Sequence, residues 1–146
     1  MNPPIAVNDC RVIALPYHDD ARGSVTILER TTEIPFDVRR AFLITNVPTG
    51  ATRGQHANMR ASQLIVCASG ALTVRIEDGT SARSIPMSSL AGAVLVPPTL
   101  WMELRDFAPG TVAVVMADTD YRAASRVHDR DEWLRAREMY LSLIHI

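Results

Sequence analysis

The sequence contains no lysine, so arginine supplies all 15 of its permanently cationic side chains. This absence excludes a Schiff base with a carbonyl substrate or pyridoxal phosphate, the phosphate-binding lysine of a Walker loop, and a lysine general base. A coding sequence rich in guanine and cytosine favours arginine codons and is enough to explain the bias. The chemical exclusions hold whatever its origin.

The sequence also has little net charge, no long apolar run and few cysteines. The 16 acidic side chains leave a net charge of −1, so the chain lacks the cationic excess that nucleic acid or an anionic membrane surface would require. No apolar run reaches the length of a membrane span, and residues 1–4 lack the character of a signal peptide. Two cysteines, Cys10 and Cys67, are too few for a disulfide framework. We therefore expect a soluble cytoplasmic protein with no nucleic-acid or membrane partner.

Short apolar segments rich in β-branched residues recur along the chain, separated by glycine and proline. Leu72, Val74 and Ile76 alternate with polar residues, which is the period of a strand with one buried face. Asp78 and Gly79 follow, and this pair favours a tight hairpin turn. Many short strands divided by turn residues are typical of an all-β sandwich or barrel. The expected strands cover residues 11–15, 24–28, 41–44, 63–68, 71–76, 93–96 and 111–116.

The spacing of apolar residues changes from that of a strand to that of a helix only near the end of the chain. Asp131 can cap a helix, and Glu132 suits its first turn. Helical spacing then relates Trp133, Arg137, Tyr140, Leu141 and Ile144. We expect a single domain over residues 1–146, with a barrel over about 10–120 and a helix over about 131–143. Whether residues 141–146 belong to the native protein stays open.

Residues 50–58, followed by Gln63 and Gly70, resemble the first motif of cupins, in which a glycine, two histidines one residue apart and a glutamate precede a second glycine. In metal-binding cupins a later histidine completes the ligand set. The corresponding positions hold His56, Asn58, Gln63 and Met102. One imidazole, two amides and a thioether satisfy no single metal ion well. We expect no catalytic metal and no other cofactor.

A narrower resemblance covers residues 13–133 and is carried by short motifs in a fixed order. These are DARGS at 20–24, IPFDVRR at 34–40, RGQHA at 53–57, Gln63 with Gly70, WMEL at 101–104, DF at 106–107 and DEW at 131–133. Together they resemble the dTDP-4-keto-6-deoxyglucose 3,4-ketoisomerases, also called WxcM-like cupins. The resemblance implies an all-β, RmlC-like cupin jelly-roll barrel with a short C-terminal helix, and a homodimer.

The same resemblance implies a metal-independent isomerase of deoxysugar biosynthesis. Such an enzyme moves a ketone between neighbouring carbons of a nucleotide-linked 4-keto-6-deoxyhexose, with dTDP as the expected nucleotide. The reaction passes through an enediol, so it needs a base at carbon 3 and an acid at carbon 4. Histidine, with a pKa of about 6.5, can serve as both. His56 and Asn58 are the predicted catalytic residues, and the product's stereochemistry at carbon 4 stays open.

The chain departs from the family pattern at Asn58, which occupies the place of the second histidine, and at Phe42 and Met102. Asn58 falls on the same strand face as His56, so it could bind the sugar carbonyl while His56 moves the proton. Alternatively, the losses leave a sugar-nucleotide-binding cupin without isomerase activity. The related 3,5-epimerases are disfavoured, because the resemblance implies that they use a catalytic lysine.

Phosphate recognition must come from arginine, because a guanidinium makes bidentate contacts to phosphate oxygens and lysine is absent. The resemblance points to Arg22 and Arg53, each followed by glycine, although either could be a surface ion pair. Trp101 could stack on the sugar or base, or simply fill the barrel mouth. Glu103 could orient the catalytic histidine or bind sugar hydroxyls. The predicted substrate-binding residues are Arg22, Arg53, Gln63, Trp101 and Glu103.

Overall fold

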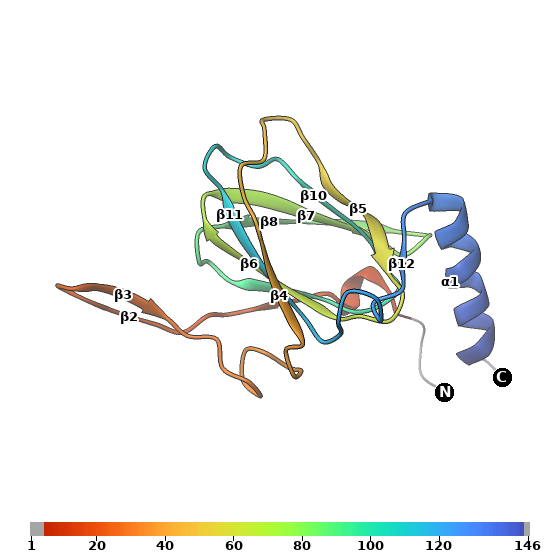
Figure 1. Cartoon of the computed structure of the whole chain (residues 1–146), viewed down its shortest axis with the longest axis horizontal. Coiled ribbons are helices and arrows are strands. Elements are labelled where there is room, and N and C mark those ends of the chain that lie inside the picture. Colours follow the sequence, from red (N-terminus) through yellow and green to blue (C-terminus); the bar gives the residue numbers. More distant parts are fainter. Residues whose placement is uncertain (1–4, 145–146) are drawn as a thin grey trace.

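The computed structural model describes residues 5–144, without the Ile144 side chain, and shows two facing antiparallel sheets with a C-terminal helix (Figure 1). One sheet contains β1 (Arg11–Ile13), β4 (Arg40–Ile44), β6 (Gln63–Ser69), β9 (Ala93–Val96) and β11 (Val112–Ala117). The other contains β5 (Arg53–Asn58), β7 (Ala71–Glu77), β8 (Ala82–Ser88), β10 (Trp101–Arg105) and β12 (Arg126–Val127). The remaining elements are η1 (Val7–Asp9), β2 (Tyr17–Asp20), β3 (Gly23–Thr26) and α1 (Arg130–Ile144). The predicted all-β barrel with a C-terminal helix is confirmed.

The cupin-like motif spans both sheets: β5, which carries His56, lies in the second sheet, and β6, which carries Gln63, lies in the first. The first sheet has the order β1-β9-β6-β11-β4, and the second has the order β12-β5-β10-β7-β8. Leu72, Val74 and Ile76 of β7 are buried in the core between the sheets, as their alternation predicts. Strand β6 is buried on both faces, because Ile34 and Phe36 pack over its outer side.

Some strands lie outside the segments that alternation predicts, among them β8 and β12. Strand β8 contains Pro86, a residue that usually argues against a strand. The structure accommodates it because β8 is an edge strand, where a missing N–H donor breaks no ladder. Strand β12 is too short to have an apolar period of its own.

The helix α1 packs on the outer face of the second sheet. Trp133 is fully buried there, with its ring centroid 5.5 Å from that of Trp101. The helix begins slightly earlier than the sequence suggests, because Asp129 and not Asp131 caps it: the Asp129 carboxylate accepts a hydrogen bond from the Glu132 N–H at 2.8 Å. No helix in the described residues combines the length and apolarity needed to cross a membrane.

The strands β2 and β3 form a hairpin that projects from the barrel at the end opposite α1 (Figure 1). Its base is closed by a hydrogen bond from the Ile27 N–H to the Pro16 carbonyl at 2.9 Å. Tyr17 and Val25 on this hairpin are 63% and 62% exposed. These two side chains lie on opposite faces of the hairpin, because Tyr17 pairs with Thr26 and Val25 with His18.

Candidate functional site

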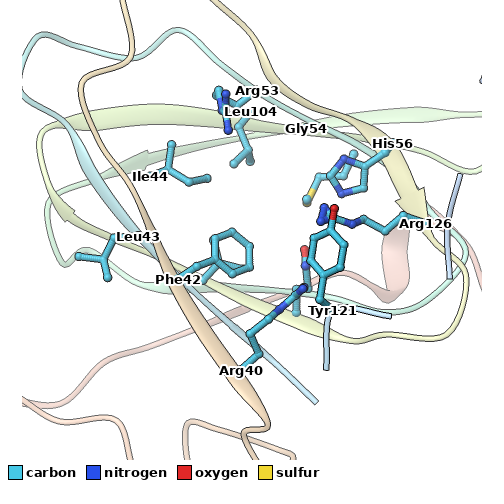
Figure 2. A pocket seen from close by; sticks show the side chains of 13 residues that line it. Arg40, Phe42, Leu43, Ile44, Arg53, Gly54, His56, Leu104, Tyr121 and Arg126 are labelled. Carbon is cyan, nitrogen blue, oxygen red and sulfur yellow. The ribbon is translucent and has the colours of Figure 1, made fainter. Parts of the chain in front are cut away.

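A cavity of about 320 Å³ opens between the two sheets. Its walls come from β4, β5, β6, β10 and β11, and from the segment between β11 and α1 (Figure 2). The polar side chains that line it are Arg40, Arg53, His56, Gln63, Tyr121 and Arg126. Apart from the backbone of Gly54, the rest of its lining is apolar.

A β-bulge in β5 brings Arg53 and His56 to the same cavity. Gly54 and His56 lie opposite consecutive residues of β10, so Gln55 between them has no partner and adopts a left-handed φ of 57°. Residues three apart on a regular strand point to opposite faces, but the extra residue of a bulge removes that difference. A Cβ on Gly54 would lie 3.0 Å from the Met102 carbonyl oxygen, so this position requires glycine.

His56 is half-buried, and its pKa lies below the ordinary histidine value. Burial is the largest cause, because removal from water disfavours the charged imidazolium. The Gly54 backbone opposes this shift, whereas Arg126, His128 and Arg40 add to it by repelling a positive charge. His56 therefore keeps a neutral imidazole, the form that accepts a proton, to lower pH than a free histidine does.

Three arginines, Arg40, Arg53 and Arg126, make the cavity cationic. No carboxylate lines it, and none of the three forms an ion pair within the described part of the chain. The Arg126 and Arg40 guanidinium carbons lie 4.0 and 5.3 Å from the centroid of the Tyr121 ring, which orients both groups. Guanidinium groups without carboxylate partners around a concave site suit an anionic ligand.

The two amide residues of the cupin-like motif have different positions. Gln63 is 2% exposed, lines the cavity, and its Oε1 has no hydrogen-bond partner in the described structure. Asn58 is also buried, and its Oδ1 has no partner there either. Strand alternation puts Asn58 on the same face as His56, but Asn58 does not line the cavity. A buried acceptor without a donor is costly, so a ligand donor at Gln63 would relieve that cost.

Trp101 and Glu103 lie on the opposite face of β10 from the cavity, which corrects the expectation that they reach the substrate. Their neighbours Met102 and Leu104 line the cavity instead. The Trp101 indole N–H donates to Glu103 at 3.0 Å, and the ring packs under α1. Arg105 also donates to Glu103, at 2.9 Å through its Nε. These residues hold the helix side of the sheet together.

Arg22 also lies away from the cavity. It sits in the turn of the β2–β3 hairpin, pairs with Asp20 at 2.8 Å, and its side chain is 90% exposed. This position matches the surface ion pair that the sequence left open as an alternative. Within the described chain, Arg22 is not part of the site.

The sequence pattern predicted no role in the site for Tyr121, Arg126 or Arg40. Arg40 is the last residue of the IPFDVRR motif, which is the one signal that pointed toward it. Tyr121 and Arg126 follow the last long strand and carry no periodic signal. They reach the cavity because β12 pairs with the end of β5, so that Arg126 lies opposite Asn58.

The positions that hold the metal ligands in metal-binding cupins carry His56, Asn58, Gln63 and Met102, which offer one imidazole, two amides and a thioether. No group of three or more histidine, cysteine, aspartate or glutamate side chains arranged for a metal ion occurs among residues 5–144. Of the four, His56, Gln63 and Met102 line the cavity, and one imidazole with an amide and a thioether does not fit a transition metal of the kind that cupins bind.

A family model described as FdtA, WxcM-like, C-terminal matches residues 8–138. The chain belongs to this family. A curated relative, the TDP-4-oxo-6-deoxy-alpha-D-glucose-3,4-oxoisomerase of Aneurinibacillus thermoaerophilus, is 31% identical over 114 residues, which cover 78% of this chain and 82% of the relative. The resemblance drawn from the sequence motifs is confirmed.

Solved structures support the same relationship. A 3,4-ketoisomerase from Helicobacter canadensis is 28% identical, with a TM-score of 0.85 over 89% of this chain and 98% of that one. QdtA, a sugar 3,4-ketoisomerase from Thermoanaerobacterium thermosaccharolyticum crystallised with TDP, is 25% identical, with a TM-score of 0.86 over 92% and 98%. These similarities confirm the predicted RmlC-like cupin fold of this FdtA family member.

Proposed function

We propose that this FdtA family member is a 3,4-ketoisomerase of deoxysugar biosynthesis that acts on a dTDP-linked 4-keto-6-deoxyhexose. The observation that carries the proposal is the convergence of His56 with Arg40, Arg53 and Arg126 on one cavity. A neutral imidazole can take a proton from a carbon next to a ketone. Guanidinium groups can hold both a diphosphate and the negative charge that develops on the ketone oxygen. The names of the relatives describe this reaction.

The proton moves through His56 in two steps. The imidazole takes the proton from carbon 3, the C–H electron pair forms the carbon 3–carbon 4 double bond, and the former ketone oxygen becomes an enediolate oxygen. A proton then passes between the two enediol oxygens. The imidazolium finally returns its proton to carbon 4 as the ketone forms at carbon 3, so no electrons or protons are gained or lost.

The arginines have separate tasks in this proposal. Arg126 and Arg40 lie close enough to His56 to lower its pKa, so we assign them to the oxygen of the reacting ketone. Arg53 lies on the other side of the bulge in β5 and is assigned to the diphosphate (Figure 2). Gln63 has an acceptor free for a sugar hydroxyl. Asn58 is given no contact with the substrate, contrary to its predicted catalytic role, because it does not line the cavity.

A single imidazole also suggests the stereochemistry of the product. His56 is the only imidazole among the described cavity-lining residues, and no carboxyl group accompanies it. One such base removes and returns the proton on one face of the ring. In a gluco-configured hexose the hydrogens at carbons 3 and 4 lie on opposite faces, so return on the first face gives the galacto configuration at carbon 4.

The test is to incubate the purified protein with dTDP-4-keto-6-deoxyglucose in deuterated buffer and follow carbon 3 by NMR. We expect a 3-keto product, and a parallel reaction in ordinary water gives its configuration through the coupling between the hydrogens at carbons 4 and 5. Absence of both exchange and product, with dTDP still bound, would instead indicate a sugar-nucleotide-binding protein. A gluco product would contradict the single-face assignment alone.

Three finer expectations remain predictions: metal independence, a homodimer and a cytoplasmic location. The donor set at the cavity supports the first. Elemental analysis of protein purified without added ions should find less than one equivalent of transition metal, and a chelator should leave isomerisation unchanged. One full equivalent of metal that is needed for activity would contradict it.

A further inference from the structure

His128 lies beside His56 but outside the cavity. The two ring centroids are 5.3 Å apart, with an angle of 50° between the ring planes. His128 is exposed and does not line the cavity, whereas His56 is half-buried and does. One imidazole therefore faces a ligand, and the other links it to solvent.

The register of the second sheet places the two histidines together. Strand β12 pairs with β5 so that Arg126 lies opposite Asn58 and Val127 opposite Ala57. The next step of this antiparallel register sets His128 across from His56. The following residue, Asp129, is held as the cap of α1. His128 is thus anchored by a strand on one side and a helix cap on the other.

The charges around the pair favour the departure of a proton from His56. Arg126 and Arg40 repel the imidazolium that forms when His56 takes a proton, and His128 adds to this effect. No carboxylate among residues 5–144 lines the cavity to hold that proton in place. Two imidazole rings at this separation can pass a proton directly or through one water molecule.

We propose that His128 exchanges the proton held on His56 with solvent. The inference rests on the proposed ketoisomerase function. After His56 takes the carbon 3 proton, the newly formed N–H bond breaks and that same proton passes to His128. His128 in turn gives a proton to water. The reverse path brings a solvent proton to His56 before it protonates carbon 4. The relay is neutral in protons and electrons, and it changes only the origin of the hydrogen at carbon 4.

The experiment uses substrate deuterated at carbon 3 in ordinary water, and measures by NMR the fraction of early product that carries deuterium at carbon 4. For the wild-type protein we expect little retained deuterium. His128→Gln should raise this fraction severalfold and leave the affinity for dTDP unchanged, because His128 does not line the cavity. Added imidazole should lower the retention in His128→Gln again, which a purely structural role of His128 would not predict.

The control variant is Arg135→Gln, which removes another exposed side chain just beyond the same capped turn and should retain as little deuterium as the wild type. Product formation with equal retention in the wild type and His128→Gln would overturn the relay alone. High retention in the wild type would overturn it as well. No product from the wild type would overturn the proposed isomerase function and, with it, the relay.

Discussion

His56 combines two properties that a proton-transfer residue needs. It has one side in the cavity, and its environment favours the neutral imidazole over the charged one. Burial is the main reason for this preference, since desolvation acts against the imidazolium. The surrounding arginines add to this preference and, in the proposed reaction, attract the negative charge of the substrate.

His56→Asn should abolish the proposed proton transfer but leave the binding of dTDP intact. General acid–base catalysis contributes about 10²–10⁴-fold, so kcat should fall by about that factor. Binding of dTDP, measured by calorimetry, should persist because the arginines remain. Isomerisation at the wild-type rate would remove His56 from the mechanism.

Arg126→Met should change the pH dependence of the reaction. The catalytic form of His56 is neutral, so kcat/KM falls on the acid side as the imidazole becomes protonated. Arg126 lowers the pKa of His56, together with burial, His128 and Arg40. Its removal raises that pKa, so the acid limb of the kcat/KM profile should move to higher pH.

The matched control for this profile is Arg122→Met, since Arg122 is exposed and does not line the cavity. Its acid limb should coincide with that of the wild type. An identical limb in Arg126→Met would show that Arg126 does not influence the protonation of His56.

At the scale of elements, Asp78 joins the turn between β7 and β8 to η1. Its carboxylate accepts hydrogen bonds from the N–H groups of Thr80 at 2.9 Å, Ser81 at 2.7 Å and Val7 at 3.1 Å. Burial would raise the pKa of this carboxyl group, but the hydrogen bonds outweigh it and lower the pKa from 3.8 to about 2. The carboxylate therefore stabilises the folded chain.

Asp78→Asn should lower the free energy of unfolding by about 2 kcal/mol at neutral pH, the equivalent of the pKa shift. In the wild type this contribution is complete above the unfolded pKa of 3.8 and is lost as the pH falls through about 2. The difference between variant and wild type in urea unfolding should shrink over that interval. Glu138→Gln, an exposed change on α1, is the control and should have a small effect. A pH-independent difference would contradict the role of the charge.

The elements also show where sequence patterns succeed. Strand β7 and helix α1 were predictable because each has an apolar period that matches the side it buries. The hairpin expected at Asp78 and Gly79 does join β7 to β8, but residues 78–81 form a longer connection than a two-residue turn, since Glu77 pairs with Ala82. Strand β12 was not predictable, because its two residues pair with β5 only once the barrel has closed.

At the scale of the whole molecule, the β2–β3 hairpin is the one part that Figure 1 shows standing clear of the barrel in the described chain. An isolated two-stranded hairpin is marginally stable in water. Tyr17 and Val25 leave one exposed apolar side chain on each face of this hairpin, because Tyr17 pairs with Thr26 and Val25 with His18. A second copy of the chain packed along the hairpin would cover these side chains, in keeping with the homodimer that the family resemblance implies.

Removal of the hairpin should therefore convert a dimer into a monomer. Residues 17–26 can be replaced by a short glycine linker, because Pro16 and Ile27 are already joined by a hydrogen bond at the base. Light scattering after size exclusion should give twice the chain mass for the wild type and the single chain mass for the variant. Circular dichroism should show that the barrel is still folded. A monomeric wild type would contradict the prediction.

The sequence by itself determined the barrel, the C-terminal helix and the family, and it pointed to His56 as the candidate base, because residue alternation and motif order can be seen in the sequence alone. It also placed Arg53 and Gln63 in the site. Only the tertiary structure decided which other side chains join them. The bulge at Gln55 turns Arg53 toward His56, and the pairing of β12 with β5 delivers Arg126.

Tertiary structure also explains why Trp101 and Glu103 do not reach the cavity. They stand one residue away from Met102 and Leu104, which line the cavity, and a single residue step on a strand exchanges the two faces of a sheet. The motif identifies this strand, but the register with its neighbours decides which of its side chains meet the ligand. The chemistry of the site thus follows from the types of its residues. Which residues reach the cavity follows from how strands that are distant in the sequence pair with one another.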